Sequence, residues 1–269
     1  MTSLRSTAAA RAPLLFAVTL VVSVFMLAPM ALSLMAGLVK NYSAGLKSGL
    51  TTRWLAQVWE VYGDTVGASL LIGLGCVGAT LLLGLPCAYM LARSRSYAAR
   101  VFEELLTLPV AVPGLATALA LILVYGQMAS FRQSFGFILV GHIVFTLPFM
   151  VRIVAAAFQR EELVALEEAA RTLGAGFRQR FLGVLVPAVF PAIVAGCLMV
   201  FTLSIGEFNL TWMLHTPLTR TLPVGLADSY ASMRIEVGSA YTLIFLAVIL
   251  PVLWALQWLA AALQNRYGV

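Results

Sequence analysis

Charged residues are scarce in this sequence, and their scarcity excludes an ordinary soluble protein. Of the 269 residues, 10% are charged and 61% are hydrophobic. A soluble domain of this length cannot bury so much apolar surface, so part of the solvent must be lipid. About 20 consecutive apolar residues in a helix cross a bilayer, and runs of that length recur along the chain. We therefore predict an all-α, polytopic membrane protein.

Cysteine and histidine are also rare, which argues against metal and redox chemistry. Three cysteines lie in apolar runs without C-x-x-C spacing, and neither histidine begins an H-E-x-x-H sequence; these residues are Cys76, Cys87, Cys197, His142 and His215. Buried free cysteines behave as small hydrophobic residues, and lone histidines without a ligand motif are mostly structural. No nucleophile and base are paired by spacing. We predict no metal site and no catalytic residue.

Lysine is nearly absent, and the chain has no loop that could bind the phosphates of ATP. Such a loop needs Gly-Lys-Ser/Thr, whereas Lys40 and Lys47 follow Val39 and Leu46. We therefore predict that this chain binds no cofactor of its own and does not hydrolyse ATP. Internal repeats, low-complexity tracts and gaps long enough for a soluble domain are also absent. We predict a single transmembrane domain over residues 1–269.

Hydropathy predicts six membrane-spanning helices. The candidate spans are residues 12–39, 66–92, 105–128, 135–157, 188–214 and 239–263. The first run is longer than the apolar region of a cleaved signal and lacks a clear cleavage site, so we interpret it as a retained span. Pro109 and Pro113 interrupt the first turns of the third span, where neighbouring helices or water must satisfy the freed carbonyl groups.

The arginines predict which ends of the spans face the cytoplasm. Six spans place both termini on one side, together with the loops at residues 93–100 and 159–187. That side holds Arg5, Arg11, Arg93, Arg95, Arg100, Arg160, Arg171, Arg178, Arg180 and Arg266, with Arg152 close by. The opposite side holds Lys40, Lys47, Arg53, Arg132, Arg220 and Arg234. Basic residues concentrate on the cytoplasmic side, so the net charge of +6 indicates topology rather than nucleic-acid binding.

The loop at residues 159–187 is charged but patterned. Leu163, Leu166, Ala169, Ala170 and Leu173 recur at helical spacing with charged residues between them, which predicts an amphipathic helix. Gly174 and Gly176 are placed to end that helix, a second short helix is expected over residues 177–185, and Pro187 marks the return into the membrane. A solvated linker is the simpler interpretation, but helical alternation and a glycine turn favour a surface that docks against another protein.

The same loop resembles a signature of one transporter family. Glu168, Ala169, Ala170 and Gly174, followed after nine residues by Val184, Val186 and Pro187, are similar to the E-A-A-x3-G-x9-I-x-L-P loop of permease subunits of bacterial ATP-driven (ABC) importers. Valine replaces isoleucine and leucine in this chain. The six spans and the LPVAVPG sequence at the third span also resemble that family, so the likeness covers nearly the whole chain.

The resemblance implies a function and a set of partners. The loop would be a cytoplasmic coupling helix that sits in a cleft of an ATPase subunit, with coupling residues at Glu168, Ala169, Ala170, Gly174, Arg178 and Pro187. Two ATPase subunits, a second permease chain and a periplasmic or lipid-anchored solute-binding protein would complete the importer in the bacterial inner membrane. We expect the second permease to be a related but distinct chain, with a homodimer as the alternative.

Glu207 is the clearest polar anomaly inside a span. A charged residue at the centre of a membrane helix costs about 2.5–3.5 kcal/mol or more, so Glu207 should face a cavity or a partner rather than lipid. Ser204 and Asn209 lie near it in sequence, and together the three residues are candidates for the translocation pathway. A structural carboxylate, hydrogen-bonded across the helix bundle, is the alternative.

The segment around Glu207 also resembles importers for polyamines, phosphonates, iron and inorganic oxyanions. We therefore predict a small charged organic solute, such as a polyamine or phosphonate, with iron or an oxyanion as the alternative. Two other classes compete with an ATP-driven importer: a secondary transporter driven by an ion gradient, against which the missing inverted repeat counts, and a membrane-embedded enzyme, for which no catalytic cluster is found.

Overall fold

The computed structural model describes the backbone of residues 2–267 and the side chains of residues 15–258, 261 and 262. The side chains of Arg5, Arg11 and Arg266, which enter the topology prediction, lie outside the described residues. Within that part of the chain the regular elements are helical, which confirms the all-α prediction.

The helices follow one another with short connections. They are α1 (Thr2–Ala36), η1 (Tyr42–Ser48), α2 (Arg53–Arg93), α3 (Tyr97–Ala111), α4 (Gly114–Tyr125), α5 (Ala129–Arg132), α6 (Phe135–Phe158), α7 (Glu161–Thr172), α8 (Phe177–Arg180), η2 (Phe181–Leu185), α9 (Val186–Ala188), α10 (Phe190–Gly206), α11 (Asn209–Leu214), α12 (Leu222–Ala231) and α13 (Ile235–Tyr267). Most residues in each long helix are apolar, and several prolines lie inside helices, including Pro86 in α2, Pro148 in α6 and Pro251 in α13.

The number of spans follows from helix length and hydropathy. Among the described residues, four helices are long and apolar enough to cross a membrane, and six spans result if each of two bent helix pairs counts as one. The bent pairs are α3 with α4, at 107°, and the Phe177–Ala188 segment with α10, at 69°. The predicted spans fall on these helices, but two of them are not single straight helices.

The third and fifth predicted spans are both broken. Val112 adopts an extended conformation before Pro113, as residues preceding proline commonly do, and this separates α3 from α4. The predicted span at residues 188–214 contains a break that its sequence did not indicate, at Glu207, whose extended backbone ends α10 before α11 begins. Hydropathy measures composition, so it does not register a break inside an apolar segment.

The chain forms two compact units, which are described separately. The first comprises Met1–Val61 and Leu226–Leu246, and the second comprises Tyr62–Gly225 and Ala247–Val269. In the first unit the indole N–H of Trp54 donates to the carbonyl of Val39 at 2.9 Å, and the amide of Tyr42 donates to Glu236 Oε1 at 2.9 Å. These bonds fasten the η1 loop to the start of α2 and to α13.

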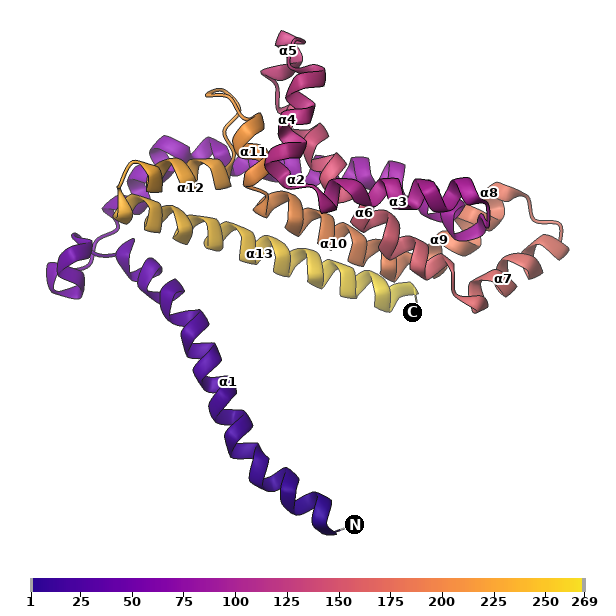
Figure 1. The fold of residues 1–269 in the computed structure, drawn as a ribbon, viewed down its shortest axis with the longest axis horizontal. Coiled ribbons are helices and arrows are strands. Elements are labelled where there is room, and N and C mark those ends of the chain that lie inside the picture. The colour runs from indigo at the N-terminus through magenta and orange to yellow at the C-terminus, as the bar shows by residue number, and fades with distance from the viewer. Residues whose placement is uncertain (1, 268–269) are drawn as a thin grey trace. The chain divides into compact units, whose positions relative to one another are not determined.

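The second unit contains the main core, in which α6 packs against α10, α3 and α4 (Figure 1). Buried side chains of α2, α6 and α10 meet there, including Cys76, Met150, Val154 and Val200. A smaller cluster around Phe137, Leu210 and Leu214 joins α6 to α11. Small residues permit the close approach: a Cβ built at Gly141 would lie 2.6 Å from both Leu210 Cδ2 and Leu214 Cδ1. Small residues at helix contacts are the usual packing device in membrane bundles.

Candidate functional site

The segment between α6 and α10 forms two helical pieces joined by a turn, as its sequence pattern predicts. α7, α8 and α9 follow the end of α6 (Figure 1). Leu163 is the buried residue of α7, whereas Glu161 and Glu162 in its first turn are exposed. Acidic side chains near a helix N-terminus interact favourably with the helix dipole, so both the charges and the single buried leucine stabilise α7.

A Schellman turn ends α7 at the glycine that the sequence analysis selected. Gly174 has φ +81°, a left-handed conformation that glycine adopts without steric cost. Its amide donates to the carbonyl of Arg171 at 3.0 Å, and the amide of Ala175 donates to the carbonyl of Ala170 at 3.1 Å. This pair of bonds defines the Schellman motif. Gly176 instead begins the next helix, where its amide donates to Gln179 Oε1 at 2.8 Å.

The six residues predicted to couple to an ATPase divide by exposure. Glu168, Ala169, Gly174 and Arg178 are exposed, whereas Ala170 and Pro187 are partly buried. Pro187 does not interrupt the helix, because the segment continues helically from Phe177 through Ala188 and bends only at Val189. The π-helical turn η2, closed by the bond from the amide of Val186 to Phe181, accommodates the proline in the turn that follows it.

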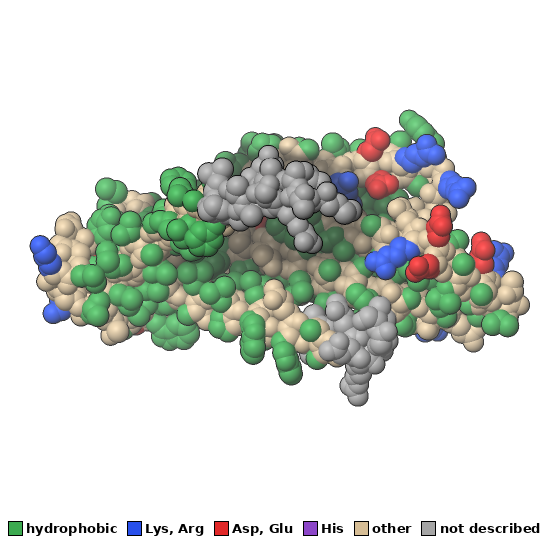
Figure 2. All heavy atoms as spheres, turned by 90° about the horizontal axis from the view of Figure 1, so that it is seen from below, with side chains coloured by type: hydrophobic (Ala, Val, Ile, Leu, Met, Phe, Trp, Pro, Cys, Tyr) green, Lys and Arg blue, Asp and Glu red, His purple; other side chains and the backbone are tan. Residues whose placement is uncertain are grey.

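Charge and exposed apolar surface coincide on this segment. Figure 2 shows red side chains, with blue ones among them, gathered in the region of α7 and α8. Large apolar side chains are exposed between those charges, led by Leu173 at 87% and followed by Phe177 and Leu182. An apolar patch rimmed by charge marks an interaction surface.

Glu167, which the sequence analysis did not select, binds this segment to the ends of two long helices. Arg93 Nε donates to Glu167 Oε2 at 2.7 Å, and the hydroxyl of Tyr89 donates to Glu167 Oε1 at 2.6 Å. Arg93 Nη1 also donates to the carbonyl of Phe158 at 2.6 Å. Burial raises the pKa of the Glu167 carboxyl, but the hydrogen bonds from Tyr89 and Arg93 and the charges of Arg93 and Arg180 outweigh it and lower that pKa below its usual value.

Four aromatic rings pack around this ion pair. The ring of Tyr89 lies 5.7 Å from Phe158, 5.8 Å from Phe177 and 5.2 Å from Phe181, measured between centroids. Edge-to-face contacts of this kind contribute about 0.5–1.5 kcal/mol beyond area burial. The rings come from α2, α6, α8 and η2, so the second helical piece is fastened to the same helix ends as α7.

Glu207 lies at the break between α10 and α11, where its side chain stabilises the new helix start. Its Oε1 atom accepts the amide of Leu210 at 3.0 Å, and its backbone carbonyl accepts the hydroxyl of Thr211 at 3.1 Å. A Cβ built at Gly114 would lie 3.2 Å from Glu207 Oε1. Glycine at the first position of α4 therefore leaves space for the carboxylate beside a second helix N-terminus, where the dipole favours negative charge.

His142 joins α6 to both sides of that break. It is buried at 2% exposure; its Nδ1 lies 2.8 Å from Ser204 Oγ on α10, and its Nε2 lies 2.8 Å from Thr211 Oγ1 on α11. Because the Thr211 hydroxyl donates to Glu207, it accepts a hydrogen bond from Nε2–H. In the neutral imidazole, Nδ1 then accepts from Ser204. The sequence analysis interpreted this histidine as structural, and the geometry agrees.

Of the predicted pathway residues, the structure brings two into one polar cluster. Ser204 and Glu207 line a cavity of about 10 Å³, whose other lining residues are Ser69, Ile72, His142, Ile205, Thr221 and Pro223. Within the described structure, Glu207 Oε2 and Thr221 Oγ1 are buried there without a hydrogen-bond partner. A cavity of this size has room for about one water molecule. Asn209, by contrast, is exposed.

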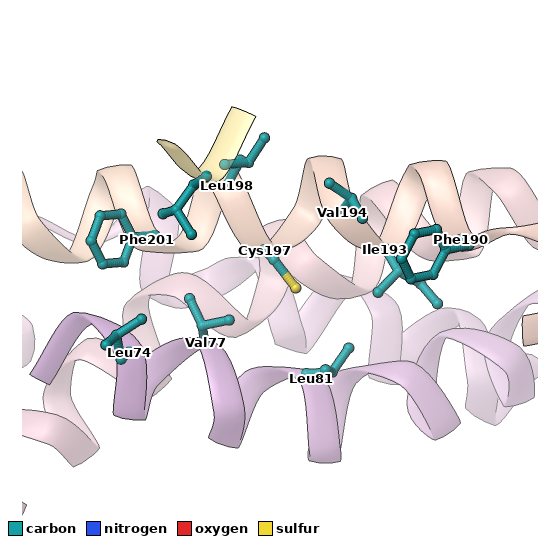
Figure 3. Close-up of a pocket in the computed structure, with 10 residues that line it drawn as sticks. Leu74, Val77, Leu81, Phe190, Ile193, Val194, Cys197, Leu198 and Phe201 are labelled. Carbon is teal, nitrogen blue, oxygen red and sulfur yellow. The ribbon is translucent and has the colours of Figure 1, made fainter. Parts of the chain in front are cut away.

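Two larger grooves lie along the helices of the second unit. The first, of about 230 Å³, is lined only by apolar side chains of α2, α10 and α13; in Figure 3 the α2 and α10 residues face one another across it, from Leu74 to Leu81 and from Phe190 to Phe201. The second, of about 480 Å³, lies between α3 and α6 and contains Thr107 and Arg152. Clusters of His, Cys, Asp and Glu suited to a metal ion are absent from the described residues.

Comparisons with known proteins identify the family. Residues 80–265 match the sequence model of the family described as "Binding-protein-dependent transport system inner membrane component". The chain is 27% identical to the putrescine transport system permease protein PotI of Escherichia coli strain K12 over 248 residues, covering 88% of each protein. It is 26% identical to the molybdenum transport system permease protein ModB of Haemophilus influenzae over 222 residues, covering 76% of this chain and 96% of that protein.

The fold is also shared with a solved transporter. A chain of a bacterial ABC transporter involved in the import of the acidic polysaccharide alginate superposes with a TM-score of 0.72 at 16% identity, covering 95% of this chain and 98% of that one. At that identity the likeness concerns the fold. The family match spans more than half of the sequence. The long apolar helices of the chain are those expected of a membrane protein. The chain therefore belongs to the family of inner-membrane components of binding-protein-dependent transport systems.

Proposed function

We propose that this chain forms half of the solute pathway of an ATP-driven importer and receives its driving force from a separate ATPase dimer. The observation that carries the proposal is the exposed surface of α7 and α8, in which Leu173 and Phe177 lie among charged side chains. Large apolar side chains that are exposed to water in a charged segment are unfavourable unless a partner protein covers them. Family membership supports an importer over the alternatives of an ion-gradient-driven transporter and a membrane-embedded enzyme.

The coupling residues have distinct roles in this proposal. Exposed Glu168 is free to pair with a basic residue of the ATPase, and the small side chain of Ala169 allows close contact. Gly174 sets the angle between α7 and α8 through its left-handed backbone. Arg178 adds positive charge to the second helical piece, whereas partly buried Ala170 and Pro187 shape the segment from within.

The orientation and the partners follow from the arginine distribution and the family. Both termini and the α7–α9 segment would lie in the cytoplasm of a bacterium, because the basic residues concentrate there. ATP and magnesium would bind to the ATPase, since the sequence has no Gly-Lys-Ser/Thr. A solute-binding protein, periplasmic or lipid-anchored, and a second permease, related but distinct, would complete the assembly, with a homodimer as the alternative.

The solute is proposed to be a small charged organic compound, such as a polyamine or phosphonate. One similar protein is a putrescine permease and another a molybdenum permease, so iron or an inorganic oxyanion is the alternative. Among the candidate pathway residues, exposed Asn209 is the one available to a solute in this conformation. Ser204 is engaged with His142, and Glu207 would reach the pathway only if the contacts at the break opened.

Copurification and uptake with the partner subunits test the proposed function. The chain is expressed with its ATPase, second permease and binding protein, and uptake is measured in vesicles with and without internal ATP. Wild-type uptake should require ATP, whereas Glu168→Lys and Gly174→Asp should insert in the membrane yet release the ATPase. Glu103→Lys, a charge reversal at an exposed residue of α3, is the matched control. Uptake by the chain alone, or unchanged ATP-dependent uptake in both loop variants, contradicts the proposal.

A further inference from the structure

Three hydrogen bonds join α7 and the ends of α2 and α6 to one another. Glu167 uses both carboxylate oxygens, one for Arg93 Nε at 2.7 Å and one for the Tyr89 hydroxyl at 2.6 Å. Arg93 is the last residue of α2, and its Nη1 donates a hydrogen bond to the carbonyl of Phe158, the last residue of α6, at 2.6 Å. One guanidinium therefore connects the middle of α7 to the ends of α2 and α6.

This ion pair differs from the other charges of the segment. Within the described part of the chain it is the one salt bridge between side chains, and its partners are only 21% and 14% exposed. Exposed ion pairs contribute little because water and side-chain entropy oppose them, whereas charge-assisted bonds with defined geometry are about twice as strong as neutral ones. Glu161, Glu162 and Glu168 are all exposed.

The surrounding aromatic rings restrict movement around the ion pair of Glu167 and Arg93. Tyr89 contacts Phe158, Phe177 and Phe181 at centroid distances of 5.2–5.8 Å, and the planes of Phe177 and Phe181 stack at 14°. Close-packed interiors transmit displacement because their side chains have few alternative arrangements. Both helical pieces of the segment are thereby packed against the ends of α2 and α6.

We propose that Glu167 is the positioning residue that transmits movement of the coupling segment to the membrane helices. Through Arg93, it makes α7 and the adjacent ends of α2 and α6 move as one body. This inference rests on the proposed function, because it assumes that an ATPase moves the segment. It differs from that function in assigning the transmission to a partly buried internal contact rather than to the exposed docking residues.

Distance measurements within the chain test the inference without knowledge of the solute. Spin labels are placed at Ala165 on α7 and Met90 on α2, both exposed, after the native cysteines are replaced by alanine. The assembled complex is compared without nucleotide and with ATP bound to an ATPase variant that cannot hydrolyse it. The wild-type distance should be narrow and unchanged by ATP. In Glu167→Gln the distribution should broaden and shift with ATP, whereas Glu161→Gln, a control on the same helix, should match wild type.

A second variant tests the two hydrogen bonds of Arg93, to Glu167 and to Phe158, separately. Arg93→Lys keeps a positive charge for Glu167 but has no second guanidinium N–H for Phe158. The distance from Ala165 to Met90 should then stay narrow, while the distance from Ala165 to exposed Ala156 on α6 should broaden. Recovery of a narrow distance in the charge exchange Glu167→Arg with Arg93→Glu would add support.

The outcomes distinguish this inference from the proposed function. If the ATPase fails to copurify with the wild-type chain, the proposed function fails. If the complex assembles and the wild-type distance changes with ATP, or if Glu167→Gln retains the wild-type distribution in both states, the positioning role is wrong. Should Glu167→Gln fail to assemble, the two distances in Arg93→Lys decide, because the inference requires one to broaden and the other not.

Discussion

Replacing Glu207 by alanine should loosen the start of α11. The carboxylate accepts the amide of Leu210 at 3.0 Å, and removal of a helix cap costs about 0.5–2 kcal/mol. Leu210 is 0% exposed, so water cannot replace the lost acceptor, and an unsatisfied buried donor costs about 1–3 kcal/mol. Because both figures describe the same bond, we take about 1–3 kcal/mol as the expected loss of local stability.

Replacing Glu207 by glutamine distinguishes the effect of the helix cap from the effect of the negative charge. Glu207→Gln keeps an acceptor oxygen for Leu210, and its new N–H₂ group faces the cavity that contains the unpaired hydroxyl of Thr221. The structural role of Glu207 therefore predicts a smaller loss in Glu207→Gln than in Glu207→Ala. Since the charged form adds only the dipole interaction with α4 and α11, typically about 0.3–1 kcal/mol, the two variants should differ clearly.

Hydrogen exchange measured by mass spectrometry on the assembled complex reports this difference. A loss of about 1–3 kcal/mol corresponds to roughly 5-fold to 140-fold faster exchange, confined to peptides that contain the first turn of α11 in Glu207→Ala. Equal exchange in wild type and Glu207→Ala would refute the capping argument. Normal exchange in Glu207→Gln combined with loss of uptake would instead assign the charge of Glu207 to the solute pathway.

Three further predictions concern the packing, the turn and the ion pair. Gly141→Ala should destabilise the chain by about 1–3 kcal/mol through overpacking, because its Cβ would lie 2.6 Å from two buried leucines. Gly78→Ala is the control, because a Cβ built at Gly78 has no neighbouring atom within 4 Å. Thermal unfolding in detergent compares the stability of the two variants. Gly174→Ala should cost about 1–2 kcal/mol from its φ of +81° without any clash, measured as weaker ATPase retention. The Glu167 carboxyl has a lowered pKa, so its stabilisation is present above the ordinary glutamate pKa and is lost as pH falls through the lowered value. Protection of the α7 segment from proteolysis, relative to Glu167→Gln, should be complete above the ordinary glutamate pKa and should vanish as pH falls through the lowered pKa.

The α7–α8 segment could be predicted from the sequence because its signals are local. Leucines and alanines at helical spacing predicted the helix, of which Leu163 is the buried residue, and the Schellman turn requires a left-handed residue where the sequence places Gly174. Both features depend on neighbours within one or two turns of the chain. Local periodicity and glycine position are therefore sufficient to describe this part of the fold.

Glu167 could not be selected on the same grounds. Two glutamates stand side by side, and the family spacing selects Glu168, which is exposed. The partner of Glu167, Arg93, is 74 positions away, and the two meet only because α6 brings α7 back to the end of α2. No periodicity in a single sequence encodes such a contact. The sequence contains several arginines and glutamates near predicted helix ends, and nothing in it distinguishes this pair from the others.

The break at Glu207 escaped prediction for a different reason. The run from Phe190 to Leu214 is apolar almost throughout, and hydropathy assigns it to one span. Helix breaks in a membrane are tolerated only where the freed backbone groups find partners. The Glu207 carboxylate accepts the freed amide of Leu210, and the Thr211 hydroxyl donates to the freed carbonyl of Glu207. His142 in turn contacts Ser204 and Thr211 on either side of the break, an arrangement that depends on how α6 packs against α10. The polar residues could be identified in the sequence, but their contacts with one another around the helix break could not be predicted from it.

α6 is the element that relates the two polar regions to each other. At one end its last residue, Phe158, accepts a hydrogen bond from Arg93 and so joins the Glu167 ion pair. Nearer its start, His142 binds α10 and α11 on either side of the break at Glu207. α6 is helical from Phe135 to Phe158, although Pro148 removes one of its backbone hydrogen bonds. Displacement of one end of α6 should therefore strain the contacts at the other. The break beside Gly114 is then the place where that strain can be relieved, since two helix starts meet there around one carboxylate. A movement begun at α7 would accordingly change the angle between α10 and α11 before it changed their internal structure.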